Sequence, residues 1–290
     1  MLTKIFDKAT SLVDSRFLLV ALFPVLVFVA ALALLLNKIG SALPGDISSK
    51  WPKWSAWQQW SSAVAAIALL FVVAYLLYIS VTPLTRAFEG YIGPIAWLGA
   101  LFKALGKRRS DDPFAYRKWA ATSSPLPSRL GNSLRAAEYH ATKAYGLDTV
   151  VLWPMLADQL GADTTKRLDA SRMTLDFFVV LTFGSSIHAI VGGAIVSVSH
   201  GGQGLWLVTV GASTITAYVT YCGAVAAARD YGDQVRTAFD LNRFALISAL
   251  RYPLPADLAE EKALWSDINE LVRSDEPRDW RLYEHPASKG

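Results

Sequence analysis

Charged residues and cysteine are both scarce in this sequence. Charged side chains make up 18% of the 290 residues and hydrophobic ones 53%, whereas ordinary soluble domains are about one quarter charged. An apolar excess of this size needs surroundings larger than an ordinary protein core, and a lipid bilayer supplies them. The single cysteine, Cys222, excludes an intramolecular disulfide and a cysteine-based zinc cluster, and its apolar neighbours predict a buried structural thiol.

Sequence motifs for catalysis and for cofactor binding are lacking as well. The sequence has no G-x-S-x-G motif, no glycine-rich nucleotide loop and no histidine pair spaced for a metal. The formal net charge of +4 is modest, and basic residues are interspersed with acidic ones. We therefore expect no catalytic residue, no cofactor, no metal and no nucleic-acid partner.

Four segments are long and apolar enough to cross a bilayer, which takes about 20 helical residues. The predicted spans are residues 17–37, 62–82, 177–198 and 205–228. Pro24 lies within the first span, and Pro83 is expected to end the second. The last two spans are expected to form a hairpin around the polar, glycine-rich turn at 199–204. Because no cleavage pattern follows the first span, we expect it to be retained.

Lysine and arginine are distributed unevenly among the segments that connect these spans. Thirteen lie between Pro83 and Asp176 and nine after Ala228, but the 38–61 loop has three and the 199–204 turn has none. The positive-inside rule therefore places residues 1–16, 83–176 and 229–290 in the cytoplasm, and the 38–61 loop outside. The expected location is an inner, or plasma, membrane, crossed four times with both termini cytoplasmic.

Two groups of residues are expected to contact lipid headgroups. The outer loop has a tryptophan at every third position, which is typical of an interfacial aromatic belt, with an aromatic ligand cage as the alternative. The tryptophans are Trp51, Trp54, Trp57 and Trp60. After the second span, residues 83–109 predict an interfacial amphipathic segment, with a re-entrant loop as the alternative. This segment ends in the basic cluster Lys107, Arg108 and Arg109.

The remaining segments predict a helical cytoplasmic domain over residues 110–176 and a helical tail over 229–290. Apolar residues recur there at helical spacing, Gly146 is expected to end one helix, and the turn at 253–255 separates two more. His140 and Asp148 would suit acid–base chemistry, but no nucleophile accompanies them. A solvated helix face is therefore the favoured interpretation of His140. The predicted fold class is an all-α integral membrane protein.

Polar and small residues recur on one face of each of the last two spans. They are Ser185, His188 and Gly192 on the third span, and Thr209, Ser213, Thr216 and Thr220 on the fourth. Intervals of three and four place each set on one helix face. In one interpretation these residues line a water-filled pore in which His188 titrates. In the other, the helices pack closely and the hydroxyls bond across the interface or to their own backbone.

Two segments resemble a group of uncharacterised bacterial multi-spanning membrane proteins. They are residues 127–156, PSRLGNSLRAAEYHATKAYGLDTVVLWPML, and residues 231–255, YGDQVRTAFDLNRFALISALRYPLP. The resemblance implies a bacterial setting and no activity. The layout of spans also resembles, in topology alone, that of bestrophin-type anion channels, which are pentamers with a helical insertion between spans two and three.

The sequence therefore leaves two functional hypotheses. The first is a homo-oligomeric bacterial inner-membrane pore or ion channel, with spans three and four facing the assembly axis. The second is a non-conducting membrane scaffold or sensor that recruits a cytoplasmic protein through its helical domain. An intramembrane enzyme is disfavoured, because no span contains Asp, Glu, Lys or Arg.

Overall fold

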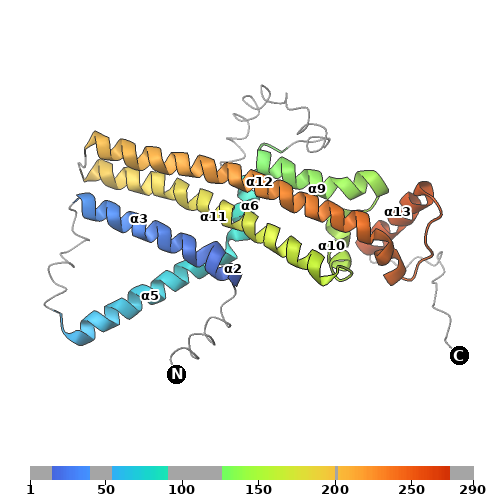
Figure 1. Cartoon of the computed structure of the whole chain (residues 1–290), viewed down its shortest axis with the longest axis horizontal. Coiled ribbons are helices and arrows are strands. Elements are labelled where there is room, and N and C mark those ends of the chain that lie inside the picture. The colour runs from blue at the N-terminus through green and yellow to red at the C-terminus, as the bar shows by residue number, and fades with distance from the viewer. Residues whose placement is uncertain (1–14, 40–53, 91–125, 200–201, 275–290) are drawn as a thin grey trace. The chain divides into compact units, whose positions relative to one another are not determined.

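The computed structural model describes residues 15–39, 54–90, 126–199 and 202–274, and every regular element in these ranges is helical (Figure 1). The chain divides into two compact units. Unit 1 comprises residues 1–87 and 173–224, and unit 2 comprises residues 88–172 and 225–290. The helices are α2 (Ser15–Phe17), α3 (Phe23–Ile39), α5 (Ala56–Ile79), α6 (Val81–Glu89), α9 (Arg129–Tyr145), α10 (Thr149–Ala157), α11 (Ala162–Val198), α12 (Gln203–Ala249) and α13 (Leu258–Ser274).

Four of the described helices are long and apolar enough to cross a membrane, as the sequence predicts. They are Ser15–Ile39, Ala56–Ile79, α11 and α12. The first is one helical run in which a π-helical turn, Leu18–Leu22, connects α2 to α3. This turn comes just before Pro24, which has no backbone N–H to donate.

Helix α5 begins before the predicted second span. Ser55 caps it: the Gln58 backbone N–H donates to Ser55 Oγ at 3.3 Å, and the Ser55 N–H donates to the Gln58 side chain at 2.9 Å. This capping box starts the helix at Ala56 rather than Ser62, inside the predicted outer loop. The helix ends at Ile79, so the expected end at Pro83 was wrong. Pro83 instead lies in the first turn of α6, where a missing N–H breaks no helical bond.

Helices α11 and α12 each run through both units without a break. They contain 37 and 47 residues. The sequence becomes apolar at residue 177 within α11 and polar again at residue 229 within α12, and neither change in composition ends the helix. Helix α12 starts at Gln203, within the predicted turn at 199–204. Within unit 1 the two helices are antiparallel neighbours, as Figure 1 shows.

Small residues bring the helices of unit 1 close together. A Cβ atom on Gly184 of α11 would overlap the ring of Phe28 on α3, and one on Gly223 of α12 would lie 2.7 Å from the ring of Phe178 on α11. In a membrane the hydrophobic effect does not drive helices together, because lipid is as apolar as their side chains. Close van der Waals packing at small residues holds them together instead. By contrast, Ala74 is the one fully buried residue of α5, which leaves this helix apolar on its outer surface.

Unit 2 has an apolar core formed by α9, α10, α13 and the adjoining parts of α11 and α12. Its largest fully buried side chains include Trp265, Phe239, Leu147, Leu152 and Leu156. Burial of these side chains provides the main stabilisation of the unit.

The corner between α9 and α10 is held in place by its own Asp148 and by side chains of α13. As predicted, α9 ends at Gly146, whose φ of 81° suits a residue without a Cβ. Asp148 caps α10 by accepting from two backbone N–H groups, and it pairs with Arg273 of α13. Asn269 of α13 donates to the Gly146 carbonyl at 2.8 Å and accepts from the Asp148 N–H at 3.0 Å. The start of α10 is thereby fixed to α13.

Candidate functional site

Most of the predicted pore-lining side chains lie buried in unit 1, between α11 and α12. Ser185, Thr209, Ser213 and Thr220 are all buried. A Cβ on Gly192 would lie 2.9 Å from the methyl group of Thr209. Close contacts of this kind are what the packing interpretation expects.

A hydroxyl that the sequence analysis did not single out completes this interface. Thr182 of α11 lies opposite Thr220 of α12, with the two hydroxyl oxygens 3.1 Å apart. The signal was present in the sequence, since Thr182 precedes Ser185 by three residues on the same helix face. Thr216 differs from the other predicted lining residues, because it is exposed and its hydroxyl donates to the Ala212 carbonyl at 2.9 Å.

His188 is the one imidazole among the described residues of unit 1. Its Nδ1 lies 2.9 Å from the Oγ of Ser213 on α12. Its Nε2 is buried and has no hydrogen-bond partner among the described residues, and the same holds for the Oγ of Ser185 one turn earlier. His188 and Ser213 thus bridge the two helices through a polar contact.

The hydroxyls around this contact differ in how they are satisfied. Those of Thr182, Ser186, Thr216 and Thr220 each donate to the carbonyl four residues earlier, at 2.7–2.9 Å. Within the described chain, Ser213 bonds to His188 alone and Ser185 bonds to nothing. The hydroxyls of Ser185 and Ser213 are therefore not committed to their own helix.

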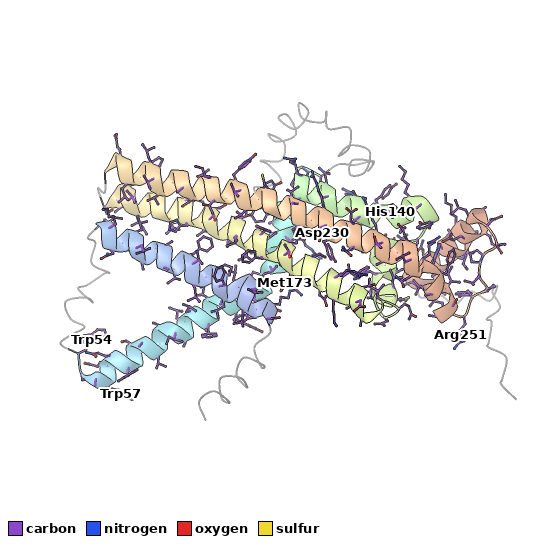
Figure 2. All side chains as sticks on the ribbon, viewed as in Figure 1. Trp54, Trp57, His140, Met173, Asp230 and Arg251 are labelled. Carbon is purple, nitrogen blue, oxygen red and sulfur yellow. The ribbon has the colours of Figure 1, made fainter. Side chains whose placement is uncertain are left out.

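The predicted lipid-headgroup residues are described in part. Trp57 and Trp60 lie in α5, with 79% and 72% of their surface exposed, and Trp54 precedes the helix and is half-buried. Figure 2 shows the side chains of Trp54 and Trp57 at the start of α5. Trp51, Lys107, Arg108 and Arg109 lie outside the described residues, as do residues 91–109 of the predicted interfacial segment.

Two predictions about single side chains are wrong. Cys222 is exposed on α12 and not buried. His140 is part-buried and lies 2.9 Å from the Oδ1 of Asp240. It therefore belongs to a polar cluster and not to a solvated helix face, and its partner is 100 residues away along the chain.

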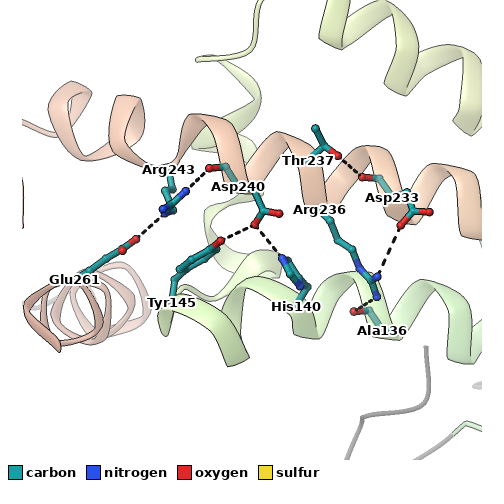
Figure 3. Close-up of polar contacts among 9 residues, drawn as sticks. All are labelled: Ala136, His140, Tyr145, Asp233, Arg236, Thr237, Asp240, Arg243 and Glu261. Atoms are coloured by element: carbon teal, nitrogen blue, oxygen red, sulfur yellow. Dashed lines mark hydrogen bonds and ion pairs between the residues drawn. The ribbon is translucent and has the colours of Figure 1, made fainter. Parts of the chain in front are cut away.

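This polar cluster joins α9, α12 and α13 in unit 2 (Figure 3). Asp240 also accepts from the Tyr145 hydroxyl at 2.9 Å. Arg243 stacks on the Tyr145 ring, 4.3 Å from its centroid, and donates to Glu261 of α13 at 2.9 Å. Burial, and then the hydrogen bond to Asp240, raise the pKa of the Tyr145 hydroxyl. These contacts of Asp240 with α9 and of Arg243 with α13 hold the three helices together.

The chain matches no protein-family model, no curated protein and no solved structure. Its likeness to uncharacterised bacterial membrane proteins therefore stays a prediction, but residues of the segment that carries the likeness have clear structural roles. Ser128 caps α9, and Asn132 bonds both the N–H and the carbonyl of Leu126, at 2.7 and 2.8 Å. A Cβ on Gly131 would lie 2.6 Å from the carbonyl oxygen of Glu89, so this glycine lets α9 approach the end of α6.

Proposed function

We propose that this chain is a homo-oligomeric scaffold or sensor of the bacterial inner membrane, which recruits a cytoplasmic protein through unit 2. One observation carries the proposal: a row of uncharged side chains is exposed along α12 within unit 2, and we call it the α12 row. Its members are Thr237, Leu241, Phe244, Ala245 and Ser248. Leu241 is 74% exposed and Phe244 is 39% exposed. These residues lie beyond the predicted span, where we expect no lipid to cover them, and the exposed apolar side chains of Leu241 and Phe244 at the middle of the row are then available to a protein partner.

The membrane location and the four-span topology rest on two further observations. From Val64 onward the exposed surface of α5 is almost entirely apolar, which suits a helix surrounded by lipid. Arg16 forms an ion pair with Asp176, so the residues just before spans one and three are neighbours. An up-and-down arrangement of four spans requires those two positions to be on the same side of the membrane. The distribution of Lys and Arg assigns that side to the cytoplasm.

The buried hydroxyls favour a scaffold or sensor over a conducting pore. Ser213 and Thr220 are engaged with α11 inside a single protomer, which leaves them unavailable to face an assembly axis. The shared hydrogen bonds and the close approach at Gly192 instead make the hairpin a rigid pair of helices. Both helices continue unbroken into unit 2.

Site-specific photo-crosslinking in living cells tests this proposal. A crosslinker at Ser248, in the α12 row, should give adducts with a protein, whereas one at Lys166, an exposed position on α11, should not. Replacing Leu241 with Glu should abolish the Ser248 adducts while leaving the helical content unchanged. Equal adducts at both positions, or none at Ser248, would count against unit 2 as a recruiting surface.

A pore or ion channel is the second candidate, with α11 and α12 facing the assembly axis. The observation that favours it is that Thr216 is exposed, together with Tyr218, on a span without charged residues. Oligomers reconstituted in planar bilayers should then conduct, and Thr216→Val should change the conductance or selectivity. Well-folded oligomers that carry no current across voltage and pH would leave the scaffold or sensor as the proposal.

A further inference from the structure

The charges around the α12 row indicate the kind of partner that this surface binds. We infer that the partner is an amphipathic helix whose apolar side chains are flanked by lysine or arginine. The inference deepens the proposed function and rests on it, because it concerns the same surface of unit 2.

The first step concerns the spacing of the row. Four of its members recur along α12 at intervals of four, three and four residues, which is the spacing that two helices packed side by side share. They are Thr237, Leu241, Phe244 and Ser248. At 1.5 Å per residue the row is about 16 Å long, or about three helical turns. A partner helix with apolar side chains at the same spacing matches this surface.

The second step concerns Phe244, which is held in place before any partner binds. The guanidinium carbon of Arg243 lies 4.3 Å from the centroid of the Phe244 ring and 4.3 Å from that of the Tyr145 ring. Arg243 also donates to Glu261 of α13 (Figure 3). The Phe244 ring thus contacts an arginine that is itself fixed, and it still presents an exposed surface. An aromatic side chain ordered in this way loses little conformational freedom on binding, which suits an anchor for a partner.

The third step concerns the basic residues on the part of α12 that belongs to unit 2. There are three, at every seventh position on one helix face, and none of them is exposed. They are Arg229, Arg236 and Arg243. Arg236 donates to the Ala136 carbonyl of α9 at 2.9 Å, and Arg243 is bonded to α13. The arginine face of α12 is therefore turned toward the neighbouring helices, as Figure 3 shows.

The acidic residues of the same part of α12 remain at the surface. Asp230 is exposed and lies seven residues before Thr237, on the same helix face. The side chains of Asp233 and Asp240 are 44% and 39% exposed. The α12 surface around the row thus has carboxylates and no exposed cation. The neighbouring helix α9 exposes charges of both signs, at Arg129, Glu138 and Lys143.

This acidic rim discriminates among the occupants that an apolar row could have. Lysine or arginine flanking the apolar face of a partner helix is attracted to the carboxylates, whereas like charges are repelled. A second copy bound row to row would bring identical surfaces together, so carboxylates would face carboxylates. An anionic lipid surface is repelled for the same reason. The charges therefore favour a basic amphipathic helix.

Two synthetic helical peptides of about 14 residues, or about four turns, test the inference. Both have leucine at intervals of three and four, and one is flanked by lysine and the other by glutamate. The full chain is held in nanodiscs of zwitterionic lipid. An environment-sensitive dye on Ala249→Cys, in a Cys222→Ser background, reports binding beside the row, since Ala249 is exposed at the end of α12. The lysine peptide should bind at least about tenfold more tightly than the glutamate peptide, and the difference should shrink as salt is raised.

Three variants separate the contribution of the apolar row from that of its rim. Leu241→Ser should weaken binding of the lysine peptide about tenfold or more, because the buried area of a leucine is lost. Asp230→Lys should weaken it about two- to fivefold. Asp169→Lys is the matched control, since it makes the same change at an exposed carboxylate of α11, and it should leave the affinity unchanged.

Equal binding of the two peptides, tighter binding of the glutamate peptide, or no binding of either overturns the inference. So does a disulfide between two copies at Leu241→Cys in the Cys222→Ser background, which would assign the row to a second copy. The Ser248 photo-crosslinker distinguishes these failures from failure of the proposed function. Protein adducts at Ser248 would keep unit 2 as a recruiting surface, whereas their absence would reject it.

Discussion

Arg16 and Asp176 form an ion pair that joins α2 to α11 within unit 1. The Asp176 side chain is fully buried, whereas that of Arg16 is 43% exposed. The two residues are 160 positions apart in the sequence. A buried carboxylate is costly unless a positive charge or hydrogen bonds compensate it, so this contact fixes the start of the first predicted span to the start of the third.

Removing the arginine should therefore weaken unit 1. We expect Arg16→Ala to lower the free energy of unfolding by about 1–3 kcal/mol, since it withdraws the guanidinium from a buried carboxylate that keeps its other contacts. Unfolding by sodium dodecyl sulfate in mixed micelles measures the change. Arg86→Ala, at an exposed arginine of α6, is the matched control and should change it by less than about 0.5 kcal/mol. Equal effects of the two substitutions would contradict a structural role for the pair.

The sequence predicts the four long apolar helices well, because hydropathy is a local property. Three predicted spans lie entirely in helices long and apolar enough to cross a membrane, and so do residues 62–79 of the second. The end of α9 at Gly146 was predictable for a similar reason, since a glycine after an amphipathic stretch supplies the left-handed conformation that ends a helix. Each of these features depends on residues within one or two helical turns.

The errors concern features that depend on contacts distant in sequence. His140 has a polar partner on α12 because α9 packs there, and nothing near His140 specifies that neighbour. Cys222 has apolar neighbours in sequence, but burial depends on which face of α12 meets α11. The hydroxyl spacing placed four residues of α12 on one face, of which Thr209, Ser213 and Thr220 are buried and Thr216 is exposed, and the spacing did not say whether the face meets water or another helix. The contacts of Ser213 and Thr220 with α11 bear on that choice.

Close helix packing in unit 1 predicts opposite effects for two glycine substitutions. Gly184→Ala would place a methyl group in the ring of Phe28, and we expect a loss of about 1–3 kcal/mol of stability. Gly211→Ala makes the same change at a position of α12 with open space around it, so it should be neutral or stabilise by up to about 1 kcal/mol through helix propensity. Unfolding in mixed micelles compares the two. Equal destabilisation by the two substitutions would show that these glycines contribute through backbone conformation and not through close helix packing.

Tyr145 makes unit 2 sensitive to alkaline pH. Burial and the hydrogen bond to Asp240 raise the pKa of its hydroxyl, so the folded chain holds this proton more tightly than the unfolded chain. The resulting stability is fully present below about pH 10, the ordinary value for tyrosine, and is lost as pH rises through the raised value. Tyr145→Phe should cost about 0.5–1.5 kcal/mol at neutral pH and flatten this alkaline decline.

Circular dichroism during denaturant unfolding, at several pH values from neutral to alkaline, follows the change. Tyr139→Phe is the control, because Tyr139 lies on the same helix but is exposed. It should reproduce the wild-type decline. An alkaline decline that persists unchanged in Tyr145→Phe would assign it to other groups.

Thr220 and Thr216 differ in their surroundings. Substitutions at these two positions therefore discriminate between the packing interpretation and the pore interpretation of the hydroxyls. Thr220 is buried and lies 3.1 Å from Thr182 across the hairpin, whereas Thr216 is exposed and bonds only its own helix. Valine keeps the shape of threonine and removes the hydroxyl. We expect Thr220→Val to cost about 0.6 kcal/mol and Thr216→Val to have no measurable effect on stability, because an interhelical hydrogen bond is lost in the first case only.

A double-mutant cycle isolates that bond. Thr182→Val and Thr220→Val should each weaken the hairpin, and together they should cost less than the sum of the two, because the shared hydrogen bond is lost once. Thr182 keeps its bond to the Phe178 carbonyl at 2.7 Å in the Thr220 variant, so a large penalty for an orphaned hydroxyl is not expected. If the free-energy changes of the two single substitutions simply add in the double variant, the hydrogen bond between Thr182 and Thr220 does not contribute to stability. If Thr220→Val instead left stability unchanged and altered a measured current, the hydroxyls would face water, and the pore hypothesis would replace the scaffold or sensor.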